Sequence, residues 1–260
     1  MKISSQHIKR LLWGLFLWFS VYQSNAQTPF EDGEVLRYEL VYNWGLIWAR
    51  AGYVDFSVQD TTIANQNYYH FIGEGSSYKN WDWFYKVRSK YEAYADVDLN
   101  SKRFIRFGKE GSNYYNRDYH VKPEAIYATF KDEDGTTSYK EMPPNASAKD
   151  VLTAIYYCRT FDFENMTEND TIPLTFYLDG EIYPSYVRFL GTEEFKHPKT
   201  KKRQDCWVFK PNLIEGTVFK EGENMTVYVS KDGSNTPIYI ETDLVIGKAK
   251  VFLQEEESSK

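Results

Sequence analysis

Apolar and polar residues alternate with a period of two along most of the chain, and this pattern predicts β-strands. Between Leu36 and Trp44, large apolar side chains alternate with Arg37, Glu39 and Asn43, as expected for a strand that buries one face. Similar patterns predict strands over residues 54–58, 68–73, 86–95, 103–108, 113–121, 125–131, 136–142, 172–178, 183–190, 205–210, 225–230, 237–242 and 248–253. Pairs of Asp and Gly between several of these strands predict tight turns, because glycine adopts a positive φ at little cost.

One segment has helical periodicity instead. It follows Pro143-Pro144 and extends over residues 148–159, where apolar side chains recur three or four residues apart. Ser147 or Asp150 is suited to begin this helix, because a short polar side chain there accepts a hydrogen bond from a free backbone N–H group. The apolar stripe of the helix must lie against another apolar surface.

About a dozen antiparallel strands with short turns and one central helix favour a mainly β fold. We expect a single, strongly curved antiparallel sheet, a half-barrel or incomplete barrel, wrapped around the helix. Two stacked β layers are the alternative, because the helix separates two series of strands. No long linker divides residues 27–260, so one β domain is expected.

The first 26 residues have the layout of a cleavable secretory signal. Basic residues precede an apolar run over residues 11–22, and small residues lead up to Ala26. The run is shorter than the ~20 residues that a membrane-spanning helix needs. We therefore expect export, cleavage between Ala26 and Gln27, and a periplasmic protein whose mature chain has no transmembrane segment.

The formal net charge of −6 becomes more negative when the basic residues of the signal are removed. An acidic chain is poorly suited to nucleic acid, whose binding depends on clustered Lys and Arg. The mature part contains two cysteines, Cys158 and Cys206, in a compartment that permits disulfides. A disulfide between them and two buried free thiols both fit the sequence. Neither the cysteines nor the histidines have the spacing of a metal site, and no cofactor is expected.

Seven segments, spread over the mature chain, carry a family resemblance. They are Gly33-Glu34-Val35-Leu36-Arg37-Tyr38, Arg50-Ala51-Gly52, Asp150-Val151-Leu152-Thr153-Ala154-Ile155-Tyr156-Tyr157, Glu215-Gly216-Thr217-Val218-Phe219-Lys220, Met225-Thr226-Val227-Tyr228-Val229-Ser230-Lys231-Asp232, Pro237-Ile238 and Val245-Ile246-Gly247. In order and spacing they resemble the domain-of-unknown-function family numbered 3108, a family of exported bacterial proteins. One departure is Cys158, which stands where an apolar residue is expected before Arg159.

The resemblance implies an envelope protein with a layout similar to the half-barrel carriers of lipoproteins or lipids. In those carriers a curved sheet and a helical lid enclose an apolar cavity. The resemblance implies no activity, because the family has none established.

The segment Lys79-Asn80-Trp81-Asp82-Trp83-Phe84-Tyr85 has too many large rings for an ordinary connecting loop. The candidate binding residues are Trp44, Trp48, Asn80, Trp81, Asp82, Trp83, Phe84 and Tyr85. Their rings would form the mouth of a cavity for acyl chains or a stacking platform for a sugar, with Asn80 and Asp82 supplying hydrogen bonds. The alternative is that the rings close one end of the barrel as ordinary core.

A basic segment stands out in this acidic chain at residues 196–203, where Lys196, Lys199, Lys201, Lys202 and Arg203 lie within eight positions. Such a segment is suited to contact anionic lipid headgroups or an acidic partner. A solvated hairpin tip is the alternative reading.

No motif of a known catalytic site is present: there is no Gly-x-Ser-x-Gly elbow, His-Glu-x-x-His, phosphate-binding loop or Cys-x-x-Cys. We therefore expect a non-enzymatic protein that binds or carries an apolar, lipid-like or lipoprotein-like envelope component. The rival hypothesis is a structural or interaction module that docks a protein or glycan partner, and a hydrolase is the third. An apolar cavity would favour a carrier, whereas a filled core with exposed Trp81 and Trp83 would favour docking.

Overall fold

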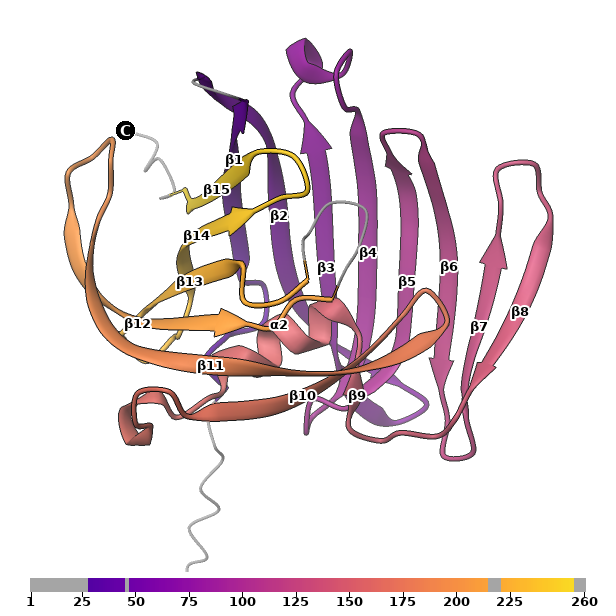
Figure 1. The fold of residues 1–260 in the computed structure, drawn as a ribbon. Helices are drawn as coiled ribbons and strands as arrows, with labels where there is room; N and C mark the ends of the chain where they lie inside the picture. Colours follow the sequence, from indigo (N-terminus) through magenta and orange to yellow (C-terminus); the bar gives the residue numbers. More distant parts are fainter. Residues whose placement is uncertain (1–27, 45–46, 215–220, 255–260) are drawn as a thin grey trace, which may run out of the picture.

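The computed structural model describes residues 28–44, 47–214 and 221–254, which form a single sheet of fifteen strands (Figure 1). The strands are β1 (Val35–Trp44), β2 (Ile47–Ile63), β3 (Gln66–Ser77), β4 (Val87–Asp96), β5 (Ser101–Glu110), β6 (Asn113–Val121), β7 (Ile126–Lys131), β8 (Thr137–Met142), β9 (Ala148–Lys149), β10 (Thr171–Leu178), β11 (Glu181–Lys196), β12 (Arg203–Pro211), β13 (Met225–Ser230), β14 (Pro237–Asp243) and β15 (Lys248–Leu253). The helical elements are η1 (Lys79–Trp81), α2 (Val151–Arg159) and η2 (Phe163–Asn165).

Hydrogen bonding runs through the sheet without a break. The strand order is β8-β7-β6-β5-β4-β3-β2-β1-β15-β14-β13-β12-β11-β10-β9. The series β1–β8 and the series β10–β15 meet where β1 pairs antiparallel with β15, from Tyr38 opposite Leu253 to Asn43 opposite Lys248. The predicted single curved sheet with one helix is therefore confirmed, and two separate β layers are not formed.

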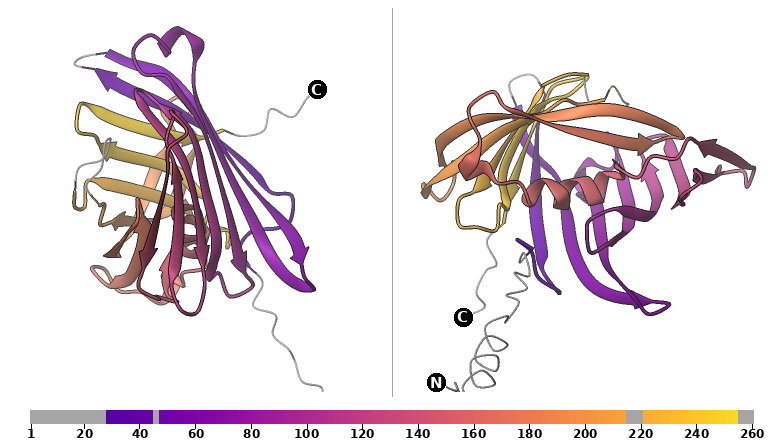
Figure 2. Two further views of the ribbon diagram at one scale, coloured as in Figure 1. Left: turned by 90° about the vertical axis from the view of Figure 1, so that its right-hand side faces the viewer. Right: turned by 90° about the horizontal axis from the view of Figure 1, so that it is seen from below.

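The helix α2 lies between the two halves of the curved sheet (Figure 2). It packs against β3, β4 and β10. Leu152 and Tyr156, one helical turn apart, are buried in a first core with Phe71 and Phe104. Tyr157 borders a second core on the other half of the sheet. Among the described residues, no helix is long and apolar enough to cross a membrane.

The helix begins later than residue 148, so its predicted start is wrong. Ala148 and Lys149 form the short strand β9, which pairs parallel with β10. Lys149 is held extended because its Nζ donates a hydrogen bond to Leu99 O at 2.5 Å. Asp150 then accepts from the backbone N–H of Thr153 at 2.8 Å, so the cap and not the apolar pattern sets the first turn.

Two strands are longer than the alternation predicts. β2 starts before residue 54 and β11 continues past residue 190, and in each the extra part lies beyond an irregularity in the pairing; β2 also continues regularly from residue 59 to Ile63. The register shifts between Leu40 and Val41 in the β1–β2 pair and between Phe189 and Gly191 in the β11–β12 pair. A bulge inserts one extra residue and interrupts the period-two pattern, although the strand continues.

Both cysteines are free thiols, so the disulfide alternative is not realised. Burial raises the pKa of Cys158 to about 12 and that of Cys206 to about 11. Cys158 packs against the second core as a small apolar side chain, which explains how it replaces an apolar residue before Arg159.

Candidate binding site

The turn between β3 and β4 is a compact, hydrogen-bonded structure. The backbone N–H of Tyr78, just before η1, donates to Ala51 O at 2.9 Å and ties the turn to β2. The backbone N–H groups of Phe84 and Tyr85 both donate to Trp81 O, at 2.9 and 3.1 Å. The aromatic segment is therefore held in a defined conformation by its own backbone.

Asp82 stabilises this turn through its side chain. Its carboxylate accepts hydrogen bonds from the Ser77 hydroxyl at 2.6 Å and from the Arg88 guanidinium at 2.8 and 3.2 Å. The Ser77 hydroxyl, together with the Arg88 guanidinium, lowers the pKa of Asp82, so the carboxylate is ionised at neutral pH. Asp82 therefore positions the turn, whereas Asn80 is exposed beside it.

Four rings in and beside the turn are exposed to solvent. Trp83 is 75% exposed, and Trp48, Phe84 and Tyr85 are 37–44% exposed. The centre of the Phe84 ring lies 5.9 Å from that of Trp83 and 6.4 Å from that of the half-buried Trp81. The rings of Trp81, Trp83 and Phe84 thus form one contiguous surface instead of closing the end of the barrel as core.

Residues from two other parts of the sheet complete this surface. The ring of Tyr42 in β1 lies 6.2 Å from that of Phe84, and its hydroxyl donates to Ile246 O at 3.0 Å. Ile246 and Val245, in the β14–β15 turn, are 69% and 53% exposed. We call the end of the sheet formed by Tyr42, Trp48, Trp81, Trp83, Phe84, Tyr85, Val245 and Ile246 the aromatic rim; it is the end from which η1 projects (Figure 1). Trp48 is opposite Asn43 in the β1–β2 pair, so it lies on the other face of the sheet from Tyr42, and the rim has rings on both faces.

Most of the predicted site residues meet in this rim. It contains Trp48, Trp81, Trp83, Phe84 and Tyr85. Trp44 ends β1, and its side chain lies outside the described residues. The sequence pattern does not mark Tyr42, Val245 and Ile246 as binding residues, although the last two belong to a segment that carries the family resemblance and form an apolar pair just before a turn glycine.

Gly52 is required for the close approach of β2 to the start of the aromatic turn. A Cβ atom at this position would lie 2.5 Å from Ser76 O and 3.1 Å from Ser77 Cα, and backbone atoms cannot move aside cheaply. We expect Gly52→Ala to lower the free energy of unfolding by about 1–3 kcal/mol. Urea denaturation measures this, with Gly75→Ala as the matched control, because the nearest atom to its Cβ would be Val87 Cγ1 at 4.0 Å. Equal stability of the two variants would contradict the role of Gly52.

The exposed apolar surface of the described residues is concentrated at the rim. Six of their eleven exposed large hydrophobic residues belong to it. Away from the rim, side chains such as Val58, Phe71 and Phe104 are fully buried in the first core, together with residues of α2. Two surface hollows lie elsewhere, one around residues 28–34 and one around residues 157–172, and both are open to solvent.

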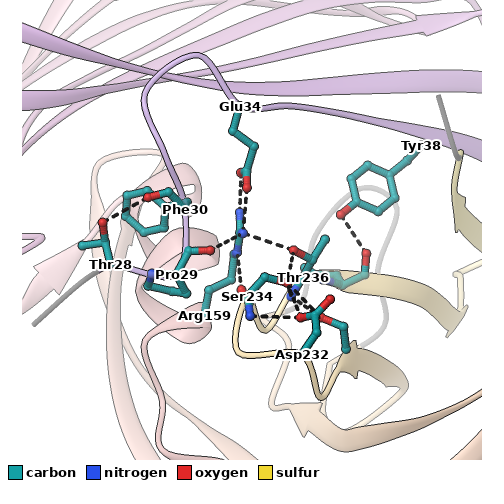
Figure 3. A network of polar contacts seen from close by, with 11 residues as sticks. Thr28, Pro29, Phe30, Glu34, Tyr38, Arg159, Asp232, Ser234 and Thr236 are labelled. Carbon is teal, nitrogen blue, oxygen red and sulfur yellow. Dashed lines mark hydrogen bonds and ion pairs between the residues drawn. The ribbon is translucent and has the colours of Figure 1, made fainter. Parts of the chain in front are cut away.

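A second cluster of polar contacts surrounds the C-terminal end of α2 (Figure 3). Arg159 is only 2% exposed, and its guanidinium binds both carboxylate oxygens of Glu34, at 2.5 and 2.9 Å. It also donates to Pro29 O at 2.8 Å, Ser234 O at 3.2 Å and Thr236 Oγ1 at 3.1 Å. Each of the three guanidinium nitrogens donates to an acceptor within the protein, so Arg159 joins the N-terminal segment, the helix and the β13–β14 turn.

The N-terminal end of α2 is held by a comparable buried cluster. The carboxylate of Asp150 accepts hydrogen bonds from Thr153 N–H at 2.8 Å, from the Thr153 hydroxyl at 2.7 Å and from the Ser101 hydroxyl. The Tyr177 hydroxyl in turn donates to Ser101 Oγ at 3.2 Å. Asp150 is fully buried, and this burial raises its pKa. These contacts link the helix to β5 and β10.

Several titratable side chains elsewhere are paired. His70 Nε2 lies 2.9 Å from Glu92 Oε2, and its ring stacks on Tyr94 with centres 4.3 Å apart. Within residues 28–44, 47–214 and 221–254, no three His, Cys, Asp or Glu side chains are grouped so as to hold a metal ion.

The model of the family described as Protein of unknown function (DUF3108) matches residues 37–254. The chain belongs to this family. The match extends from β1 to the end of β15, and it therefore includes the aromatic rim, α2 and the basic segment. Among curated proteins, none matches the chain.

A solved structure has a similar fold. It is the β-barrel-like protein of domain of unknown function DUF1849 from Brucella abortus, with a TM-score of 0.52 and 8% sequence identity. The similarity covers 85% of this chain and 95% of that chain. At this identity the likeness shows a shared β-barrel-like architecture only.

In this member of the DUF3108 family, segments that carry the family resemblance meet at the ends of α2. Glu34 comes from the first segment and binds Arg159. Tyr38 in the same segment donates to Pro237 O at 2.8 Å, and Ser230 Oγ receives the backbone N–H of Thr236 at 3.1 Å. These contacts connect the first segment with the segments of β13 and β14 beside the C-terminal end of α2.

Proposed function

We propose that the protein is an exported, periplasmic, non-enzymatic binding protein that holds an apolar, lipid-like component of the cell envelope at its aromatic rim. The observation that carries this proposal is the rim itself, in which the exposed rings of the β3–β4 turn lie beside Tyr42, whose hydroxyl donates to the backbone of exposed Ile246. A contiguous exposed apolar surface of this kind is typical of interaction sites.

The composition of the rim favours a lipid-like ligand over a purely polar one. Tryptophan and tyrosine rings are suited to an interface between apolar and polar surroundings, because each has an apolar body and a polar group. Trp48 also lies beneath Lys250, whose Nζ is 4.7 Å from the ring centre. An apolar chain would bury the rings while the charged group stayed hydrated.

The packing of the described residues supports binding at the rim instead of inside the sheet. The helix α2 lies between the two halves of the sheet (Figure 2), and its side chains Leu152 and Tyr156 are buried in the first core. A ligand at the rim leaves this core intact. The polar side chains at both ends of α2, such as Arg159 and Asp150, form hydrogen bonds that hold the helix in place, which is consistent with a non-enzymatic role.

Binding of the purified protein to vesicles of neutral phosphatidylcholine tests the proposal. We expect Trp48→Ala/Trp83→Ala to weaken binding by at least roughly tenfold, because burial of one large ring contributes about 1.5–3 kcal/mol. The matched control is Tyr139→Ala, which removes a ring that is 78% exposed on the edge strand β8, far along the sheet from the rim. Binding of this control should equal that of the wild type.

Native mass spectrometry of the protein purified from its own envelope supplies an independent test. A co-purifying lipid that is lost in Trp48→Ala/Trp83→Ala would support the proposal. A clean apo mass, together with vesicle binding that does not depend on the two tryptophans, would overturn it. That outcome would favour the rival hypothesis of a module that docks a protein or glycan partner.

A further inference from the structure

The hairpin between β11 and β12 carries a second surface of distinct chemistry. Its turn contains Lys196, Lys199, Lys201, Lys202 and Arg203, all of which are exposed. Arg203 pairs with Glu194 at 2.7 Å, and Lys201 Nζ donates to Pro198 O at 2.6 Å. Lys196 and Lys199 form no salt bridge with a residue in the described part of the chain. We call residues 196–203 the basic turn; it projects toward the same end of the molecule as the aromatic rim (Figure 1).

The basic turn has a defined shape, because His197 organises its backbone. The Nδ1 atom of His197 accepts hydrogen bonds from the backbone N–H groups of Lys199 and Thr200, at 3.3 and 3.1 Å. The backbone of His197 is also bonded to that of Lys202 and Lys201, at 2.9 and 3.0 Å. The lysine side chains therefore project from a fixed turn, so fewer backbone conformations are lost on binding.

Aromatic contacts fix the direction in which this hairpin points. The Phe195 ring stacks on that of Tyr239 at 4.7 Å, and the His197 ring lies edge-on to that of Phe252 at 5.5 Å. Tyr239 is directly opposite Phe252 in the β14–β15 pair. The hairpin is thus pressed against one face of the C-terminal strands.

The same face leads from the basic turn to the aromatic rim. Phe252 and Lys250 are two residues apart in β15, so their side chains lie on one face of the sheet. Lys250 in turn lies over the ring of Trp48, which belongs to the rim. His197, Phe252, Lys250 and Trp48 therefore form a continuous row from the basic turn to Trp48, the rim ring on this face of the sheet.

We infer that the basic turn and the aromatic rim together dock the protein on a bilayer surface that contains anionic lipids. This inference rests on the proposed function and names its ligand class. Lysines of the basic turn contact the phosphate groups, while rings of the rim enter the interfacial layer. Charge complementarity selects this occupant, because a chain with a formal net charge of −6 places five basic residues within eight positions at this turn.

Co-sedimentation with vesicles tests the inference, with phosphatidylcholine vesicles compared with vesicles that also contain phosphatidylglycerol. We expect tighter binding to the anionic vesicles and weaker binding as salt is added. Lys196→Gln/Lys199→Gln should lower the affinity for anionic vesicles by roughly 25-fold, since each lysine near such a surface contributes about fivefold. The same variant should bind neutral vesicles as the wild type does.

The matched control is Lys122→Gln/Lys131→Gln, which removes two exposed lysines at either end of the β6–β7 hairpin. This control should bind anionic vesicles as the wild type does. Equal losses in the two double variants would overturn the inference, because net charge alone would then govern binding. Displacement by soluble glycerol phosphate at matched ionic strength would also overturn it, because the turn would then bind a single free phosphate.

The two proposals fail in different ways. If binding still depends on Trp48 and Trp83 but not on anionic lipid, the docking inference fails and the proposed function survives. If the tryptophan variant binds every vesicle as the wild type does, the proposed function fails, and the inference fails with it.

Discussion

Replacement of Arg159 by methionine is expected to lower the free energy of unfolding by about 3–5 kcal/mol, the largest effect among the changes considered for this protein. The variant leaves the Glu34 carboxylate without its bidentate partner and removes the donors to Pro29 O and Thr236 Oγ1. Removal of one member of a buried ion pair costs more than the pair contributed, because the remaining charge stays desolvated. Urea denaturation followed by tryptophan fluorescence measures the loss.

The matched control for Arg159 is Arg103→Met. Arg103 also forms a bidentate pair, with Asp118 at 2.7 and 3.0 Å, but the side chains are 42% and 31% exposed. Solvent screens this pair, so we expect a loss of at most about 1 kcal/mol. In the double variant Glu34→Gln/Arg159→Met the loss should be smaller than the sum of the two single losses. Equal losses for Arg159→Met and Arg103→Met would show that the buried pair does not hold the helix.

The second large effect is expected at Asp150. Asp150→Ala removes the helix cap, which costs about 1 kcal/mol, and leaves the buried Thr153 hydroxyl without its acceptor, which costs about 1–3 kcal/mol more. Asp150→Asn retains a carbonyl oxygen that accepts from Thr153 N–H, so its loss should be smaller. Chemical denaturation at neutral pH measures the free energy of unfolding, which we expect to be highest for the wild type, lower for Asp150→Asn and lowest for Asp150→Ala.

The stability of the wild type relative to Asp150→Asn should also depend on pH. Burial raises the pKa of Asp150 above its ordinary value of 3.8, so the folded protein binds this proton more readily than the unfolded chain. The stability that this carboxyl gains from its raised pKa is therefore fully present below its pKa in the unfolded chain, and it is lost as pH rises through its pKa in the folded protein. We expect the free energy of unfolding of the wild type to rise relative to that of Asp150→Asn as pH falls toward about 4. A difference that does not change with pH would contradict the raised pKa.

Local alternation was sufficient to place most strands. The ranges predicted for β6, β13 and β15 agree with the structure. The alternation fails where a bulge interrupts it, as in β2 and β11. It also fails at Ala148 and Lys149, where a side-chain hydrogen bond to Leu99 holds the chain extended before the helix.

The candidate site was predictable only where its residues are consecutive. The rings between Trp81 and Tyr85 stand together in the sequence, so composition alone identifies them. Tyr42 and Ile246 are 204 residues apart, and only the β1–β15 pairing brings them together. The role of Asp82 was also hidden, because its partners Ser77 and Arg88 meet it through the conformation of the turn.

The pairing of β1 with β15 has a consequence for the order in which the protein can be completed. β1 is among the first strands to be synthesised and β15 is the last, so one edge of β1 stays unpaired until nearly the whole chain exists. Contacts of such long sequence separation form slowly, and an unpaired strand edge attracts other chains in the meantime. A nascent chain of this fold therefore depends on protection of its first hairpin until the C-terminal strand arrives.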